Sequence, residues 1–254
     1  MRKTSGILLL LVLVLLFSSC RTINSKRTSL GITQKTVYLS FDDGPDAEVT
    51  PELLDVLKKY NVKAIFCLLG VNCRRYPDLV RRIHNEGHFI INHGYSDKFA
   101  VQMGNEEFRN NLIMGEKAIS LALGFDTEIK LYRPQGGFYN SHHERIWKEE
   151  GFIMLPVTVR AHDAVSTSAE QNRVVKKIVH RIMRKNGGLI LLHDARESYV
   201  RKDTILEKKP KSSFNRSWIP RTVEEIIKEL MEKGFVISDP DTYIHKLVNE
   251  ARDG

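Results

Sequence analysis

The sequence predicts one α/β domain of about seven parallel strands, arranged as a barrel or a wound sheet. Short apolar segments alternate with amphipathic ones, which is the order expected when helices connect parallel strands. Of the 254 residues, 42% are hydrophobic and 28% are charged, a composition typical of a globular domain with a full core. Polar residues also gather where the apolar segments end, and that edge of a parallel barrel holds the chemistry.

Strands are expected where β-branched and other apolar residues run together between turn residues. The first such segment, TVYLSF, is followed at once by the polar stretch DDGPD. In chain order, the predicted strands cover residues 36–41, 63–70, 88–92, 129–133, 152–159, 189–193 and 235–238.

Helices are expected where apolar residues recur every three or four positions between those strands. The predicted helices cover residues 50–60, 76–87, 105–124, 141–151, 171–188 and 221–234. Capping signals mark three of their starts, because short polar side chains accept hydrogen bonds from the first free N–H groups. These signals are Thr50 before Pro51, Asn105, and a capping box of Ser141 with Glu144.

Residues 1–19 are predicted to be an export signal rather than part of the domain. A basic start precedes an apolar run from Ile7 to Phe17 that is short for a membrane-spanning helix. Ser18-Ser19-Cys20 is similar to the end of a bacterial lipoprotein signal, which implies lipidation of Cys20, a membrane anchor and a place in the cell envelope. An ordinary cleaved signal and an uncleaved anchor are the alternatives. Residues 20–35 are polar and unpatterned, as in a tether.

The charge is positive and unevenly distributed. The formal net charge is +8, and eight basic but only three acidic residues lie between Arg196 and Arg221. This segment is interpreted as a solvated loop or as a patch facing an anionic glycan or membrane surface. Nucleic acid is not expected as a partner of an exported chain. The apolar setting of Cys67 favours a buried thiol over a disulfide with Cys73.

Acidic, basic and histidine side chains follow several predicted strands at or just after their ends. Since the carboxyl ends of parallel strands meet at one edge, these side chains are expected to lie close together. Each alone is compatible with an ordinary surface role, but their coincidence on one edge predicts a functional site. They are Asp42, Asp43, His93, Arg133, Asp163 and His193.

Several stretches together resemble the polysaccharide deacetylases, the NodB-homology or family 4 carbohydrate esterase group. The resemblance covers about residues 36–193, with a looser tail to residue 237, and places a deacetylase domain at residues 36–247. It implies a distorted (β/α) barrel. The stretches that resemble the family's motifs are LSFDDGPD, the approach FCLLGVNCRRYPDLVRRIHNEGHFIINHGYSD, YRPQGGFYN, AHDAV and LILLHD.

The resemblance implies a divalent metal held by Asp43, His93 and Asp97, most simply zinc, with manganese, iron, cobalt or nickel as alternatives. His93 and Asp97 are four residues apart, so one turn or a tight loop puts them on one face. Three protein ligands with open positions are the arrangement of a catalytic metal site.

The family's mechanism implies roles for the other residues. Asp42, paired with Arg133, would be the general base, and His193, oriented by Asp163, would protonate the leaving amine. The remaining implied positions are the backbone N–H of Gly136 at the oxyanion and Leu191 beside the acetyl methyl. The implied reaction hydrolyses a carbon–nitrogen bond that is not a peptide bond. It removes N-acetyl groups from an amino-sugar polysaccharide such as peptidoglycan, a chitin-like polymer or an exopolysaccharide.

The sequence departs from the family pattern in four places. Asp97 replaces a histidine ligand, Gln135-Gly136 replaces Pro-Tyr, Arg160 replaces an aspartate, and Ala164 replaces a tryptophan. Trp218 is a candidate replacement for the lost substrate wall, with a packing role as the alternative. These departures keep two further functions open, a non-catalytic glycan-binding module and an O-acetyl esterase. The sequence predicts neither the glycan nor the oligomeric state.

Overall fold

The structure is a computed structural model that describes residues 21–22, 35–127, 130–195 and 216–253. The predicted signal, Cys20, most of the tether and the basic segment up to residue 215 lie outside the described residues. Among the helices of the described residues, none combines the length and the apolar character needed to cross a membrane.

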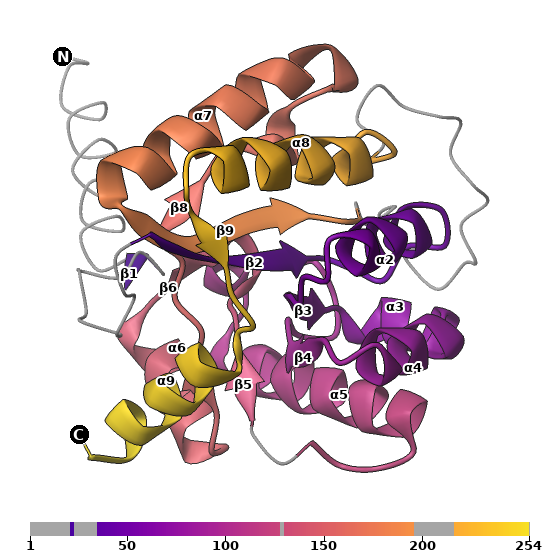
Figure 1. The fold of residues 1–254 in the computed structure, drawn as a ribbon. Coiled ribbons are helices and arrows are strands. Elements are labelled where there is room, and N and C mark those ends of the chain that lie inside the picture. The colour runs from indigo at the N-terminus through magenta and orange to yellow at the C-terminus, as the bar shows by residue number, and fades with distance from the viewer. Residues whose placement is uncertain (1–20, 23–34, 128–129, 196–215, 254) are drawn as a thin grey trace, which may run out of the picture.

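One parallel sheet organises the domain, which confirms the predicted fold class (Figure 1). The strand order is β7-β5-β4-β3-β2-β9-β8, and β10 pairs with the start of β2. The strands are β2 (Thr36–Asp42), β3 (Ile65–Leu68), β4 (Phe89–Asn92), β5 (Leu131–Tyr132), β7 (Ile153–Met154), β8 (Val159–Arg160), β9 (Gly187–His193) and β10 (Val236–Ile237).

The centre of the sheet is formed by β2 and β9. They pair in register over all seven residues of each strand, from Thr36 opposite Gly187 to Asp42 opposite His193. All the paired strands of this sheet are parallel, so their carboxyl ends meet at one edge. The register therefore places Asp42 beside His193 before any side-chain contact is considered.

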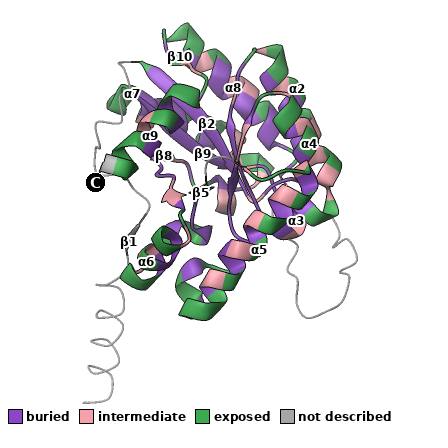
Figure 2. Cartoon of the chain, turned by 90° about the horizontal axis from the view of Figure 1, so that it is seen from below, coloured by how far each residue is buried: buried purple, intermediate pink, exposed green. Residues whose placement is uncertain are grey.

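Helices cover the sheet on both sides. In Figure 1, α7 and α8 lie on one side of β2 and β9, and α6 and α9 lie on the other. Figure 2 shows buried residues on the strands and exposed ones on the outer helix faces. The helices are α2 (Val49–Lys59), α3 (Gly70–Arg75), α4 (Pro77–Asn85), α5 (Asn105–Leu123), α6 (Ser141–Glu149), α7 (Gln171–Lys185), α8 (Ile219–Glu232) and α9 (Asp241–Asp253).

Apolar side chains fill both faces of the sheet. One cluster joins β2 to α2, α7 and α8, and another joins the inner face to Tyr243 and Ile244 of α9. Burial of this apolar surface is the main stabilising term of the fold. Cys67 and Cys73 are both buried free thiols, so the structure contains no disulfide between them.

The predicted helix starts differ from the observed ones at three places, by one residue at α5 and α6 and by two at α2. The N-cap of α6 is Asn140, which accepts from the N–H groups of His142 and His143, rather than Ser141. The residue before α5 is Gly104, so Asn105 lies inside the helix. At α2, Asp46 accepts from the first N–H groups, and Thr50 is occupied elsewhere.

The predicted strand at residues 152–159 is two separate strands. Pro156 lies between them, and proline cannot donate to a strand ladder. As a result β7 pairs with β5 at one edge of the sheet, whereas β8 pairs with β9 at the other. Sequence analysis also missed α3, α9 and the short antiparallel pair of β1 (Arg21–Thr22) with β6 (Phe138–Tyr139).

Candidate active site

The turn after β2 aims two adjacent carboxylates in different directions. Asp43 has a φ of +77°, a left-handed conformation that turns the chain sharply after Asp42. Asn72 holds the turn by donating from Nδ2 to the carbonyl oxygen of Asp43 at 2.8 Å. Gly44 is required here, because a Cβ would lie 2.5 Å from both carboxyl oxygens of Asp194.

Asp42 forms a buried ion pair with Arg133. Nη1 of Arg133 lies 2.5 Å from Oδ1 of Asp42 and donates at 3.0 Å to Oγ of Ser40. Both side chains are almost completely buried. Burial alone would raise the pKa of the Asp42 carboxyl, but Arg133 and two neighbouring histidines lower it below its ordinary value. Asp42 is therefore held in its charged form, as a general base requires.

His93 lies between the two carboxylates, at the end of β4. Its Nδ1 is 2.7 Å from the carbonyl oxygen of Arg133, which can only accept, so Nδ1 bears a proton. Nε2 then faces Oδ1 of Asp43 at 3.4 Å and Oδ2 of Asp42 at 3.8 Å. Burial lowers the pKa of His93, but these carboxylates raise it above its ordinary value. The environment of Nε2 thus favours a cation.

Two of the three predicted metal ligands fit a divalent cation. A metal-binding histidine typically fixes its orientation by donating its other ring N–H to a carbonyl, and His93 makes this contact. Asp97 does not complete the set, because no three His, Cys, Asp or Glu side chains among the described residues are grouped to hold a metal.

The loop between His93 and Asp97 is fixed by side chains from outside it. Oδ1 of Asn111 accepts from the N–H groups of Tyr95 and Ser96, at 3.1 and 2.9 Å. Nε2 of Gln135 donates to the carbonyl of Ser96 at 3.1 Å. The loop conformation therefore depends on two buried amides, and sequence analysis gave no signal for either.

His193 and Asp163 form the second buried pair. The same oxygen of Asp163, Oδ2, accepts from the backbone N–H of His193 at 2.8 Å and lies 3.0 Å from its Nδ1. Burial lowers the pKa of His193, but Asp163, together with the carboxylates of Asp43 and Asp42, raises it to about 9. The imidazole is thus protonated at neutral pH, with Nε2 left for a substrate. Arg216 supports Asp163 from behind by donating to its carbonyl at 2.8 Å.

Asp194, which sequence analysis missed, lies under the Asp42–Gly44 turn. Its side chain is completely buried, and Oδ2 accepts from Oγ1 of Thr50 at 2.6 Å. Burial raises its pKa to about 7. Thr50 in turn accepts from the N–H of Asp46 at 2.8 Å, so Asp194 joins β9 to the start of α2. Its place directly after His193 is the only hint in the sequence.

The substrate-facing wall differs from the prediction. Gly136 has a φ of +69°. A Cβ on Gly136 would lie only 2.9 Å from ring atoms of Phe99. Phe99 is 47% exposed and is the aromatic side chain beside this turn. Leu191 is buried, and its contact with the acetyl methyl stays a prediction. Trp218 is buried in the core cluster with α2, α7 and α8, so it has the packing role that was the alternative to a substrate wall.

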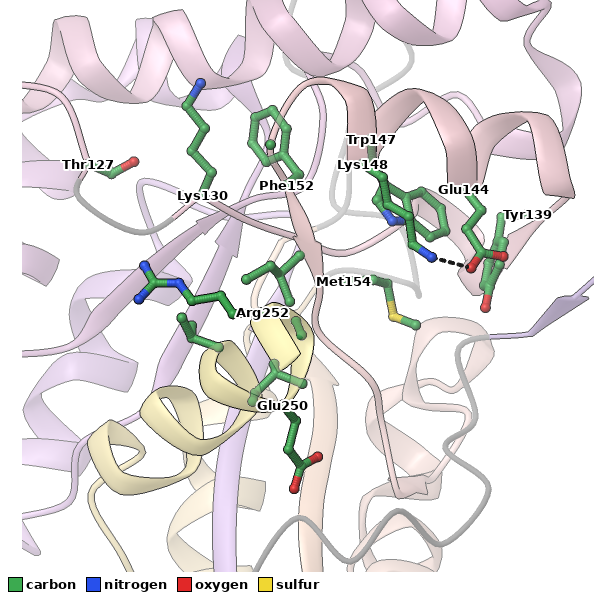
Figure 3. Close-up of a pocket in the computed structure, with 15 residues that line it drawn as sticks. Thr127, Lys130, Tyr139, Glu144, Trp147, Lys148, Phe152, Met154, Glu250 and Arg252 are labelled. Carbon is green, nitrogen blue, oxygen red and sulfur yellow. Dashed lines mark ion pairs between the residues drawn. The ribbon is translucent and has the colours of Figure 1, made fainter. Parts of the chain in front are cut away.

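A hollow of about 890 Å³ lies elsewhere, between α6, α9 and β7 (Figure 3). It is lined by Phe152, Trp147 and Arg252, and by Lys148 paired with Glu144 at 3.1 Å. None of the predicted site residues lines it. The buried acid–base pairs, rather than this open groove, define the candidate active site.

Comparisons with known proteins identify the family of the chain. The family model for polysaccharide deacetylase matches residues 31–155. Two peptidoglycan-N-acetylglucosamine deacetylases of Bacillus cereus are similar to the chain. One is 40% identical over 134 residues, 53% of this chain and 48% of the relative. The other is 33% identical over 168 residues, 63% of this chain and 73% of the relative. The chain thus spans about half the length of the first of these relatives.

Solved structures give the same result. A peptidoglycan N-acetylglucosamine deacetylase superposes with a TM-score of 0.64 at 30% identity, covering 83% of this chain and 88% of the other. A family 4 acetyl xylan esterase from Clostridium thermocellum, solved with a cobalt ion, superposes with a TM-score of 0.64 at 25% identity, covering 83% and 91%. With these matches and the two acid–base pairs at the sheet edge, the chain belongs to the polysaccharide deacetylase family.

Proposed function

We propose that this protein is a metal-dependent hydrolase that removes N-acetyl groups from an amino-sugar polysaccharide. The observation that supports it most directly is the register of β2 and β9, which sets Asp42 opposite His193. One buried pair holds a charged carboxylate, and the other holds a protonated imidazole. A base and an acid on one edge are what hydrolysis of an unactivated amide requires.

Asp43 and His93 would hold the divalent metal. When bound, the metal would supply Lewis acidity toward water and the substrate carbonyl. Asp42 accepts the proton of the attacking water, and Arg133 keeps the carboxylate charged and holds it at the edge where the carboxyl ends of the strands meet. Zinc is the simplest candidate because its common ligands include imidazole and carboxylate, while manganese, iron, cobalt and nickel remain alternatives.

His193 donates a proton to the departing amine. An amine anion is too poor a leaving group to depart unprotonated, so this step decides between amide and ester substrates. Asp163 prepares His193 by fixing the ring through Nδ1 and, with Asp43 and Asp42, by raising its pKa to about 9. The N–H of Gly136 is proposed to stabilise the oxyanion, and Leu191 to contact the acetyl methyl.

Two other functions rest on specific observations. A non-catalytic glycan-binding module is favoured because, among the described residues, no third His, Cys, Asp or Glu side chain is grouped with Asp43 and His93 to hold a metal. An O-acetyl esterase is favoured by the acetyl xylan esterase among the similar structures. Neither function needs a protonated His193, whereas amide hydrolysis does.

Acetate release separates these functions. The full chain would be assayed on chitotetraose, on peptidoglycan glycan strands and on O-acetylated xylan, each with and without a chelator. Amide deacetylation predicts acetate from an N-acetylated glycan that stops with chelator and returns with zinc. Release from acetylated xylan alone would support the esterase. Glycan binding without any release would support the module.

The protein is also proposed to be exported and anchored to a bacterial membrane through lipidated Cys20. The support is the sequence alone, since Cys20 lies outside the described residues. Metabolic labelling with a fatty acid should mark the wild type and spare Cys20→Ala. Label retained by Cys20→Ala would contradict the assignment.

A further inference from the structure

A second arginine, Arg160, lies at the mouth of the barrel beside the catalytic groups. It ends β8, and in the register it stands beside Leu191 of β9, which is itself opposite Ser40 of β2. Side chains in one such row point to the same side of a parallel sheet. Arg160 therefore faces the side of the sheet from which Asp42 and His193 act.

The guanidinium of Arg160 is placed against the turn that holds the proposed oxyanion donor. A Cβ on Gly137 would lie 2.8 Å from Nη2 and 3.3 Å from Nη1 of Arg160. Only glycine allows the guanidinium to approach the backbone this closely. Arg160 is thus located between the Gly136–Gly137 turn and Leu191, next to where the N-acetyl group is proposed to bind.

Two donors of Arg160 are buried without a hydrogen-bond partner, namely Nε and Nη2. These two nitrogens lie on one edge of the guanidinium and form a planar fork that matches the two oxygens of a carboxylate. Burial lowers the pKa of Arg160 and outweighs the attraction of the nearby Asp42, whose carboxylate is already paired with Arg133. Unpartnered donors of this kind are rare in folded proteins and call for a ligand.

Arg133 has the same two nitrogens unpartnered but differs in two respects. It is completely buried, and its charge is already paired with Asp42 through Nη1. Arg160 is partly exposed, and among the described residues no carboxylate pairs with it. Its terminal bonds can therefore turn the fork toward a group that enters from the mouth.

We propose that Arg160 binds a carboxylate of the substrate, so that the enzyme prefers a glycan bearing a carboxylate on or next to the N-acetylated sugar. This inference rests on the proposed function and names its substrate class. Carboxylate is favoured over a neutral hydroxyl because only an anion both fills the fork and compensates the buried charge. The aspartate expected at this position in the family would repel the same group.

The test compares two ligands that differ only in the carboxylate. One is a peptide-free peptidoglycan tetrasaccharide, and the other is the same sugar with its carboxyl groups reduced to alcohols. Binding is measured by calorimetry on chelator-treated protein, where no turnover occurs. The wild type should bind the acidic sugar roughly tenfold to a hundredfold more tightly, as expected for a bidentate charged contact.

Three variants test whether Arg160 causes the tighter binding of the acidic sugar. Arg160→Gln should abolish it, and Arg160→Lys should keep only part, because lysine retains the charge but loses the fork. Arg173→Gln removes an exposed arginine of α7 and should leave the preference unchanged. Thermal unfolding establishes that each variant is folded.

Equal binding of the two sugars by the wild type would overturn the inference, as would a preference that survives in folded Arg160→Gln. Acetate release distinguishes this failure from failure of the proposed function. A wild type that releases acetate without any carboxylate preference contradicts the Arg160 inference alone. Carboxylate preference without acetate release from any N-acetylated glycan contradicts the deacetylase proposal alone.

Discussion

Functional side chains at the centre of the sheet are positioned differently from those on its flanks. At the centre, β2 and β9 pair over seven residues and set Asp42 opposite His193 through backbone hydrogen bonds. On the flanks, β5 and β8 are two residues long. There the loops depend on buried side chains such as Asn111 and Gln135.

This difference coincides with where the sequence resembles the family and where it departs. Asp42 and His193 at the centre, and the partners that orient them, follow the family motif. Every departure, including Asp97 and Arg160, lies on a flank or in a loop. A ladder of backbone bonds fixes the proposed acid and base whatever the neighbouring side chains are, whereas a loop held by a few amides can accept new residues. We therefore expect the centre to supply the reaction and the flanks to set metal and substrate preference.

The largest effect is expected at the centre, from Asp42→Asn. Loss of the general base should reduce acetate release at least about 100-fold. Nη1 of Arg133 can still donate to the amide oxygen, so the variant should remain folded by circular dichroism. Asp55→Asn, which removes an exposed carboxylate paired with Arg82, is the matched control. Near-normal activity in Asp42→Asn would show that the reaction does not use this carboxylate.

The second effect concerns pH and comes from the other central pair. Because the pKa of His193 is raised to about 9, the rate on an amide substrate should fall as the pH rises through about 9. Asp163→Asn removes the strongest of the charges that raise this pKa and leaves the burial that lowers it. The alkaline limit should then move down from about 9 toward the ordinary value of 6.5.

The profile of kcat/KM against pH measures this shift. The free energy of unfolding that protonated His193 contributes depends on pH in the same direction as the rate. It is complete below 6.5, the value for an unfolded chain, and is lost as the pH rises through about 9. An alkaline limit that stays in place in Asp163→Asn would mean that another group sets it.

The central pairs were predictable from sequence because their physics is local. An apolar strand that ends in Asp42-Asp43 and another that ends in His193 must bring those groups to one edge if the strands are parallel. The residues that support these pairs from behind were not predictable in the same way. Arg216, which donates to the carbonyl of Asp163, and Thr50, which donates to Asp194, come from elements distant in sequence, and their type is compatible with any surface or cap.

The flank predictions failed for a related reason. The apolar run at residues 152–159 has no periodicity that reveals a break, and only its proline shows that it joins opposite edges of the sheet. Asp97 was implied as a ligand by the family resemblance and supported by its spacing from His93, but spacing defines separation along the chain and not the path of the loop. Trp218 was judged by its position after the acid, whereas the apolar surface of α8 and its neighbours decides where the ring packs.

A third and smaller effect should separate Asp43 from Asp97. Asp43 contacts His93 at the proposed metal position, so Asp43→Ala should weaken metal binding roughly 10- to 100-fold. Asp97→Ala should retain most of the metal, because Asp97 is not grouped with these two. Metal content is measured by mass spectrometry after dialysis against zinc. Equal losses in the two variants would place Asp97 in the site as a third ligand, and Asp97→His should then tighten zinc.

The smallest effect is expected at the flank wall, from Phe99→Ala. Its ring stands beside Gly136 and is 47% exposed, so we expect it to contact a sugar ring that binds at this turn. Contacts of this kind contribute about 1 kcal/mol, so KM for chitotetraose should rise roughly fivefold while kcat changes little. Leu121→Ala, at a 77% exposed residue on α5, is the control for removing a large apolar side chain from the surface. A fall in kcat with unchanged KM would instead mean that Phe99 holds the Gly136 turn in its catalytic conformation, and the flank would then take part in the reaction as the centre does.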